Sequence, residues 1–295
     1  MNDLPAVPLE EGVRMVRAAN PSAMTLSGTN TYILGTGDVA VIDPGPALPG
    51  HLDAILAALA PGERISHIFV THAHLDHSPL ARPLAEATAA PVLAFGPPSA
   101  GRSAVMAALA ETGLAGGGEG VDSQFNPDVR LADGDTVSHG DWSLTALHTP
   151  GHFCNHLCFQ WRDIAFSGDH VMGWASTLIS PPDGDLSDYF TSLERLRAVD
   201  ARAFYPGHGD PVRDTGRRLD ELTRHRQDRT AQILAALADS PATPAELSAR
   251  IYTDTPPALM AAAQRNIFAH LIDLVTKNHV TVNGAPSASS LYSKA

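Results

Sequence analysis

The stretch Thr71-His-Ala-His-Leu-Asp-His-Ser-Pro79 (THAHLDHSP) places four potential metal ligands within six residues: His72, His74, Asp76 and His77. It follows an apolar run at residues 67–70 that predicts a strand, and it precedes a pattern typical of a helix. Ser78 and Pro79 predict the N-cap and the first position of that helix, directly behind His77. The four ligands are therefore expected in a strand-to-helix loop.

Three later apolar runs end in the same way. SLTALHTPGH leads to His152, DIAFSGD leads to Asp169 and AFYPGH leads to His208, and a glycine precedes each of these residues. The carboxyl ends of neighbouring strands meet at one edge of a sheet, where α/β architectures commonly bind ligands. A lone histidine is most often a partly buried, hydrogen-bonded residue, but four such strand ends predict one shared metal site. Imidazole and carboxylate donors suit zinc, manganese or iron.

Strand-like runs alternate with Ala/Leu-rich helical patterns, which predicts an α/β fold of layered strands and helices. The predicted strands are residues 31–34, 39–43, 67–71, 91–94, 144–147, 157–160, 164–167 and 203–205. The predicted helices are residues 51–60, 79–89, 100–111 and 188–199. The glycine-rich segment 113–122 lacks the Gly-Lys-Ser/Thr ending of a phosphate-binding loop, so we expect a surface loop there.

The composition is that of an ordinary globular protein, with 295 residues, 44% hydrophobic and 18% charged. A formal net charge of -12 argues against a broad basic surface for long nucleic acids. The two cysteines, Cys154 and Cys158, form neither a zinc-knuckle pair nor a redox C-x-x-C motif. The N-terminal residues 1–15 resemble neither a signal nor a transit peptide, and no apolar run is long enough to span a bilayer. We therefore expect a cytoplasmic protein without membrane contact.

Beyond residue 213 the pattern becomes mainly helical, so we expect two parts, residues 1–213 and 214–295. The first predicted helix of the second part carries Arg217, Arg218, Arg224, Arg226 and Arg229. These arginines either contact phosphate or form a solvated face with i,i+4 pairs such as Asp220 with Arg224.

A capping box at residues 243–246, a longer helix at 259–277, a strand at 280–282 and an Asn-Gly turn follow. This order is similar to a small winged-helix unit. We expect it to cover the rim of the active site or to form a homodimer contact, because fold alone does not establish nucleic-acid binding.

In this order and spacing, His72-x-His74-x-Asp76-His77, His152, Asp169 and His208 resemble the metallo-β-lactamase superfamily. The segments TLSGTNTY, HTPGH, FSGD and YPGHG, with the helical tail QRNIFAHLIDLVTKNHV, are more narrowly similar to the β-lactamase-like protein 2 subgroup. Animal members of that subgroup are described as single-strand endoribonucleases. The resemblance implies a four-layer αββα sandwich for residues 1–213, with the winged-helix-like unit at 214–295.

The resemblance also implies a dinuclear centre in which a hydroxide shared by two divalent metal ions attacks the substrate. The first metal would be held by His72, His74 and His152, and the second by Asp76, His77 and His208. Asp169 would bridge the two ions, and Asp76 would also orient the hydroxide. Zinc is the expected metal, with manganese or iron as alternatives. Asn30 and His156 lie in segments close to the metals in the family, either as catalytic residues or as supporting scaffold.

Several functions remain open at this point. The resemblance favours a metal-dependent hydrolase acting on the phosphodiesters of single-stranded nucleic acid. The same chemistry suits a thioester or other acyl ester as a small-molecule substrate, as in the glyoxalase II type. An iron-dependent persulfide dioxygenase and a non-catalytic nucleic-acid-binding module are the further alternatives. True β-lactamases hold their second metal with a cysteine, whereas this chain offers Asp169 and the Asp76-His77 pair, so antibiotic hydrolysis is not expected.

Overall fold

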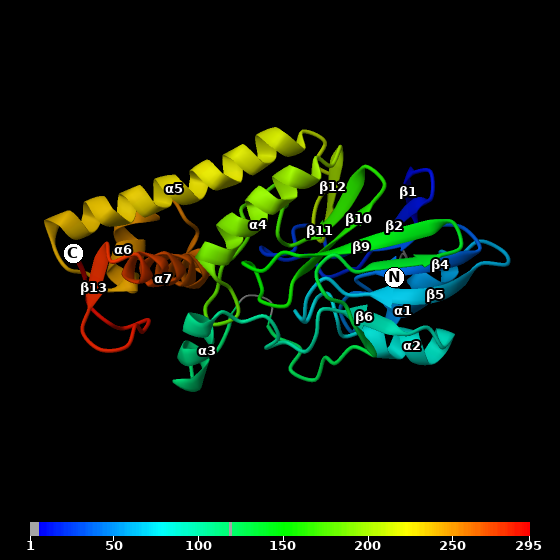
Figure 1. The fold of residues 1–295 in the computed structure, drawn as a ribbon, viewed down its shortest axis with the longest axis horizontal. Coiled ribbons are helices and arrows are strands. Elements are labelled where there is room, and N and C mark those ends of the chain that lie inside the picture. The colour runs from blue at the N-terminus through cyan, green and yellow to red at the C-terminus, as the bar shows by residue number, and fades with distance from the viewer. Residues whose placement is uncertain (1–5, 118–119) are drawn as a thin grey trace.

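The computed structural model describes residues 6–117 and 120–295 and stacks two β-sheets face to face (Figure 1). The first sheet has seven strands in chain order. They are β1 (Val7–Glu10), β2 (Val13–Arg17), β3 (Asn30–Leu34), β4 (Asp38–Ile42), β5 (Arg64–Phe69), β6 (Val92–Ala94) and β7 (Val129–Arg130). The second sheet has the order β12-β11-β10-β9-β8. Its strands are β8 (Thr136–His139), β9 (Trp142–His148), β10 (Leu157–Trp161), β11 (Ile164–Gly168) and β12 (Ala203–Pro206).

Strand direction explains why the ligands meet. Pairing in the first sheet is antiparallel from β1 to β4 and parallel from β4 to β7. In the second sheet β8 to β11 are antiparallel, and β12 runs parallel to β11. The ends of β11 and β12 therefore lie at one edge of their sheet, and β5 of the facing sheet ends just before the histidine-rich loop.

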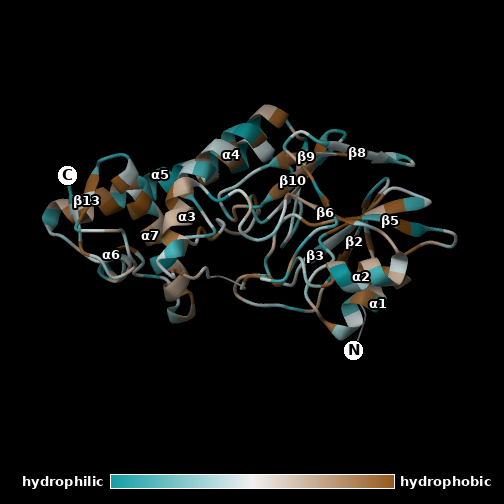
Figure 2. Cartoon of the chain, turned by 60° about the horizontal axis from the view of Figure 1, so that its bottom comes forward, coloured by the Kyte–Doolittle hydropathy of each residue, from teal (hydrophilic) through white to brown (hydrophobic). Residues whose placement is uncertain are grey.

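Helices cover the outer faces of both sheets. Residues of α1 and α2 pack on the first sheet, and residues of α4 and α5 pack on the second. The bounds are α1 (Pro49–Ala57), α2 (Ala81–Thr88), α3 (Ala104–Glu111), α4 (Leu186–Val199) and α5 (Thr215–Asp239). Brown, hydrophobic segments run along the strands, whereas α4 and α5 alternate with teal, hydrophilic ones (Figure 2). The predicted α/β, four-layer αββα architecture is confirmed.

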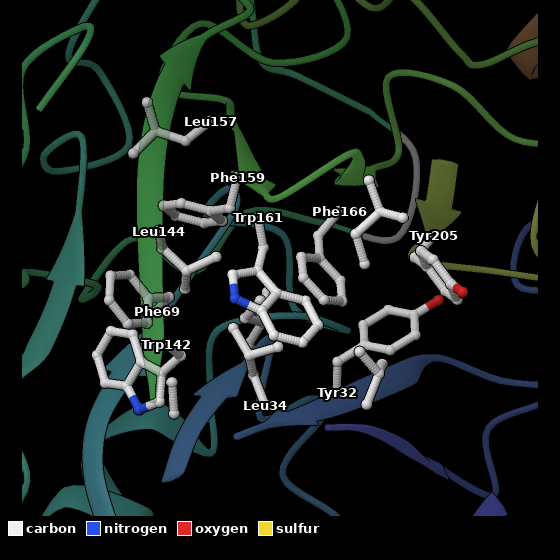
Figure 3. Packing of buried hydrophobic residues seen from close by; sticks show 14 of the residues in the cluster. Tyr32, Leu34, Phe69, Trp142, Leu144, Leu157, Phe159, Trp161, Phe166 and Tyr205 are labelled. Atoms are coloured by element: carbon white, nitrogen blue, oxygen red, sulfur yellow. The ribbon is translucent and has the colours of Figure 1, made fainter. Parts of the chain in front are cut away.

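An aromatic core joins the two sheets (Figure 3). The ring of Phe69 on β5 lies 5.2 Å from Phe159 and 5.8 Å from Trp142, both of the second sheet, measured between ring centroids. Tyr32 on β3 lies 5.0 Å from Phe166 on β11. Each large apolar side chain buried in this way contributes roughly 1.5–3 kcal/mol. The core thus holds the two sheets, and the ligands at their ends, at a set separation.

The C-terminal part forms its own core against α3. It contains α6 (Pro244–Ile251), the 3-10 helix η1 (Pro257–Leu259), α7 (Met260–Thr276) and the hairpin of β13 (Val280–Val282) and β14 (Tyr292–Lys294). The predicted capping box is present, because Thr243 and Glu246 each accept from the other's backbone N–H. In Figure 1 this unit lies beside the sandwich, connected to it by α5. Met106 and Leu109 of α3 belong to its core.

Some local predictions were wrong. Helix α2 begins at Ala81, with Leu80 as a cap that makes no side-chain hydrogen bond. The hydroxyl of Ser78 donates to Asp122 at 2.9 Å, and no backbone N–H among the described residues donates to it, so this serine does not act as the N-cap. Strands β1, β2, β7, β8 and β14 were not predicted. Residues 1–5, part of the N-terminal segment judged free of a targeting signal, lie outside the described residues.

Residues 118 and 119 of the glycine-rich segment also lie outside the described part. The flanking residues form backbone hydrogen bonds with the histidine-rich loop, from Leu75 N to Gly120 O at 3.0 Å and from Asp122 N to Ala73 O at 2.9 Å. This segment therefore lies along the ligand loop. Among the helices described, none has the length and apolar character needed to cross a membrane.

Candidate metal centre

Three histidines from two loops form the first ligand group. His72 and His74 follow β5, and His152 follows β9. The Nε2 atom of His72 lies 2.9 Å from Nδ1 of His74, and Nε2 of His152 lies 3.1 Å from the same atom. One ligand atom of each residue lies within 4.8 Å of the others, and all three residues are buried. Three imidazoles therefore converge on one point, as in a three-histidine metal site.

A second group combines two carboxylates with two histidines, namely Asp76, His77, Asp169 and His208. The Nε2 atom of His208 lies 3.1 Å from Oδ2 of Asp76 and 3.2 Å from Oδ2 of Asp169. The Nε2 atom of His77 lies 3.4 Å from Oδ1 of Asp169. Asp169 also reaches the first group, because its Oδ2 lies 3.9 Å from Nε2 of His152. The Asp169 carboxylate thus lies between the two groups.

Unpartnered polar atoms at this centre fit a pair of metal ions. Oδ1 of Asp76, Nε2 of His77 and Oδ1 of Asp169 are buried and have no hydrogen-bond partner among the described residues. A buried polar atom left without a partner costs about 1–3 kcal/mol. Nitrogen and oxygen donors of this kind bind borderline and hard divalent cations. The fold and the two groups therefore suit a dinuclear metal site.

The close packing of the second group after β12 also explains why residue 207 is a glycine. A Cβ atom on Gly207 would lie 2.4 Å from Oδ1 of Asp169 and 2.6 Å from Cε1 of His77. Such distances are far inside van der Waals contact, so the chain before His208 approaches the centre only without a side chain.

The two groups differ in their proton affinity. Burial lowers the pKa of His74 to about 3, assisted by the neighbouring His152, so its lone pair is available to a metal. Burial also acts against the charged form of His208, but the carboxylates of Asp169 and Asp76 outweigh it and raise the pKa of His208 to about 10. The pKa of His77 is raised in the same way, well above its ordinary value. Binding of a metal by the second group therefore displaces protons.

Residues outside the two groups orient the ligands. Oδ2 of Asp43 lies 2.8 Å from Nδ1 of His77, and the same carboxylate accepts from the backbone N–H and the hydroxyl of Thr71, each at 2.7 Å. Nδ1 of His152 lies 2.8 Å from the carbonyl oxygen of Leu178. Contacts of this type set the tautomer and the ring orientation of a ligating histidine. Sequence reasoning missed Asp43, although an acidic residue directly after the apolar strand VAVI was a usable signal.

Asn30 and His156 lie near the centre but outside the cavity described below. The amide nitrogen of Asn30 donates to the carbonyls of Pro206 and Gly209, which flank His208. Nδ1 of His156 lies 3.0 Å from the Thr149 hydroxyl, and its ring lies 5.2 Å from that of His72. These contacts favour the supporting alternative for both residues, and a catalytic role for either stays a prediction.

A cavity of about 260 Å³ opens directly onto the metal ligands. His74, His152, Asp169 and His208 line its floor, and its walls come from a loop near residue 24, from residues 172–178 and from η1 and α7. The wall residues are mainly apolar, including Met24, Met172, Trp174, Leu178, Leu259 and Ala263. None of the described residues that line this cavity is a lysine or an arginine.

Two side chains of the C-terminal part hold the segment that carries Leu178. Arg226 on α5 is 1% exposed and donates to the carbonyl oxygen of Thr177. The Oδ1 atom of Asn266 on α7 accepts from the backbone N–H of Ile179 at 3.1 Å. Because Leu178 accepts from His152, the C-terminal part supports a metal ligand as well as the cavity wall.

The five arginines of α5 do not form a phosphate-binding face. Arg217 and Arg218 pair with Glu221, Arg226 is buried, and Arg229 lies over the Tyr252 ring at 3.9 Å. The specific pair of Asp220 with Arg224 was a wrong prediction, because Asp220 pairs with Arg197 of α4 at 2.7 Å. The i,i+4 pair that does form joins Arg217 to Glu221.

Comparisons with known proteins agree with this geometry. The family model described as "Metallo-beta-lactamase superfamily" matches residues 24–208, and the "Beta-lactamase associated winged helix domain" matches residues 243–288. The boundary at residue 213 stays a prediction. The "Beta-lactamase-like protein 2 homolog" of Caenorhabditis elegans is 29% identical over 273 residues, which cover 89% of this chain and 84% of that protein.

Two further proteins extend the comparison. The "Atrochrysone carboxyl ACP thioesterase" of Aspergillus fumigatus is 31% identical over 244 residues, covering 80% of this chain and 68% of that protein. The crystal structure of a metallo-beta-lactamase family protein from Thermus thermophilus superposes with a TM-score of 0.76 at 25% identity, covering 97% of this chain and 99% of the other. The likeness thus includes the C-terminal part.

Proposed function

The chain belongs to the metallo-beta-lactamase superfamily of hydrolases, and from this premise we propose that it hydrolyses an ester or thioester with a small, largely apolar acyl group. The observation that carries the proposal is the cavity at the metal ligands, with its apolar walls and no cationic side chain among its described residues. Burial of an acyl chain against such walls contributes roughly 0.8 kcal/mol per CH₂ group.

The same observation argues against single-stranded nucleic acid, the substrate favoured by sequence resemblance. Proteins that bind single strands combine a positively charged groove with aromatic stacking surfaces. Here the cavity walls carry no lysine or arginine among the described residues, and four of the five arginines of α5 are ion-paired, buried or stacked. The net charge of -12 adds to the repulsion of a polyanion.

We infer that His72, His74 and His152 hold one divalent metal ion and that Asp76, His77 and His208 hold a second, with Asp169 shared between them. Zinc suits these donors best. When bound, the metal pair makes a water nucleophilic at neutral pH and stabilises negative charge on the carbonyl oxygen. The Asp76 carboxylate, besides holding the second metal, would also orient that water.

The chain's other residues position these groups and shield the reaction. Asp43 holds His77 through its ring nitrogen, and Leu178 holds His152 in the same way. The apolar walls exclude water from the acyl part of the substrate, which strengthens electrostatic interactions at the floor. Cytoplasmic location and homodimer formation stay predictions.

Turnover assays on zinc-loaded protein test the proposal. Hexanoyl-N-acetylcysteamine, p-nitrophenyl butyrate and a single-stranded RNA oligonucleotide would be compared at equal metal content, with chelator-stripped protein as the control. We expect metal-dependent hydrolysis of the two acyl substrates and no RNA cleavage. Cleavage of the RNA without turnover of either acyl substrate would overturn the proposal.

A further inference from the structure

The side-chain amide of Asn266 has an orientation that its neighbours dictate. Its Oδ1 atom accepts from the backbone N–H of Ile179 and from Nη1 of Arg226, each at 3.1 Å. Both partners are donors only, so the atom facing them must be the oxygen. The NH₂ group therefore lies on the opposite side of the side chain.

That NH₂ group is available to a ligand. Nδ2 of Asn266 makes no hydrogen bond to another described residue, and Asn266 lines the cavity at the metal centre. Its neighbours in the cavity wall include Leu178, Leu259 and Ala263, which offer no side-chain partner. An amide donor without a protein partner gains from a ligand that supplies an acceptor.

The donor is also held rigidly. Arg226 binds Asn266 through Nη1, donates to the carbonyl of Thr177 through Nη2 and lies over the Tyr189 ring at 5.4 Å from its centroid. The side-chain amide of Asn266 on α7 is thus fixed by contacts with α5 and with the segment 177–179. A group that is already ordered loses little conformational freedom when a ligand binds.

The wall contains four hydroxyl groups, those of Ser176, Thr177, Tyr252 and Thr255, but they are less selective. Hydroxyls can donate or accept, and they rotate to suit either partner. The NH₂ group of Asn266 only donates. Asn266 therefore favours an acyl chain with an acceptor oxygen over a plain alkyl chain, and unlike the hydroxyls it does not also favour a donor.

We propose that Nδ2 of Asn266 binds an acceptor oxygen on the acyl group, so that the site prefers oxo-substituted acyl thioesters to unsubstituted ones. This specificity rests on the proposed esterase or thioesterase function. It adds a substrate-binding contact from α7, which lies outside the residues 24–208 that carry the metal ligands.

The Asn266→Asp substitution tests the NH₂ donor of Asn266 separately from its Oδ1 atom. Aspartate keeps an oxygen for Ile179 N and Arg226 Nη1 but replaces the NH₂ group with a second acceptor. The matched control is Gln264→Glu, which makes the same change of charge on α7 at a residue that does not line the cavity. Hexanoyl-N-acetylcysteamine would be compared with its 3-oxo, 4-oxo and 5-oxo derivatives, using kcat/KM on zinc-loaded protein.

We expect the wild-type protein and Gln264→Glu to prefer at least one oxo substrate by roughly tenfold, the scale of one hydrogen bond. Asn266→Asp should lose this preference, so that the ratio of kcat/KM for the oxo substrate to kcat/KM for the hexanoyl substrate falls to about one. Turnover without any oxo preference in the wild-type protein would overturn the inference and leave the proposed function standing. The wild-type result decides this even if Asn266→Asp fails to fold.

A binding measurement separates the two proposals. Calorimetric titration of metal-free protein with hexanoate and 5-oxohexanoate reports on the cavity wall without catalysis. If the wild type hydrolyses no acyl substrate but binds 5-oxohexanoate more tightly than hexanoate, and Asn266→Asp does not, the function fails and the Asn266 contact stands. Equal affinities together with no turnover would overturn both.

Discussion

Oδ2 of Asp43 lies 2.8 Å from Nδ1 of His77, so a residue at the end of β4 orients a ligand that follows β5. The Asp43 carboxylate also accepts twice from Thr71, which fixes its own position. We expect Asp43→Asn to lower the affinity for the second metal by about 10–100-fold, because His77 loses its negatively charged partner.

Competition with a chelator dye would measure that affinity for each metal. Asp141→Asn is the matched control, since Asp141 accepts from Thr36 in a loop remote from the ligands. The role assigned to Asp43 is wrong if both variants bind two metals as tightly as the wild type.

Asp169→Ala tests the shared carboxylate. Its oxygens lie near His77, His152 and His208, so we expect the variant to lose metal and activity while it stays folded. Elemental analysis, turnover and circular dichroism would be measured together. Asp163→Ala, which removes a surface partner of Arg202, should keep both metals. An Asp169→Ala protein with two metals and normal turnover would exclude the bridging assignment.

Arg226 is expected to act on the metal centre through the segment that holds His152. Arg226→Met removes the Arg226 donor from the Thr177 carbonyl and leaves Asn266 Oδ1 with only the Ile179 N–H, so we expect affinity for the first metal to fall by about tenfold. Arg224→Met, on the same helix but without an ion pair among the described residues, should leave metal binding unchanged. Equal affinities in the two variants would contradict a link between α5 and the centre.

The buried His51 predicts a loss of stability in acid. Burial lowers the pKa of His51 to about 4 from an ordinary value of 6.5, and its Nε2 lies 2.9 Å from the Thr31 hydroxyl. Below pH 6.5 His51 becomes protonated in the unfolded chain, whereas in the folded chain it stays neutral down to about pH 4. The free energy of unfolding therefore decreases as the pH falls through this window, by roughly 2–3 kcal/mol at most.

Urea unfolding at pH 7.5, 6 and 5 would measure this effect. Other buried histidines also titrate, so the difference between the wild type and His51→Gln isolates the contribution of His51. The variant should show a flatter dependence on pH, since glutamine carries no proton in this range. Parallel pH curves for the two proteins would show that His51 contributes nothing.

The sequence predicted those features that repeat along the chain. Four apolar runs ending in His72, His152, Asp169 and His208 predicted a shared site, because strands end at a common edge. The capping box at Thr243 was also readable, since it depends on residues only three positions apart.

Features that depend on distant neighbours were not readable. Ser78 had the pattern of an N-cap, but Asp122, 44 residues away, binds its hydroxyl. Asp43 follows an apolar strand, but nothing local identifies His77 as its partner; Asn266 carries no local signal at all, because packing of separate elements brings its partners close. Strands β1 (VPLE) and β2 (VRMVR) were missed because runs of only four and five residues without strict apolar–polar alternation are a weak pattern.

Part of the cavity wall comes from a different stretch of the chain than the floor. The metal ligands lie within residues 24–208, whereas η1 and α7 supply Leu259, Ala263 and Asn266. Part of the selectivity is therefore encoded apart from the reactivity. Substitutions in the C-terminal part can therefore change the preferred substrate while the metal ligands stay the same. This holds as long as the buried Arg226 still donates to the carbonyl oxygen of Thr177.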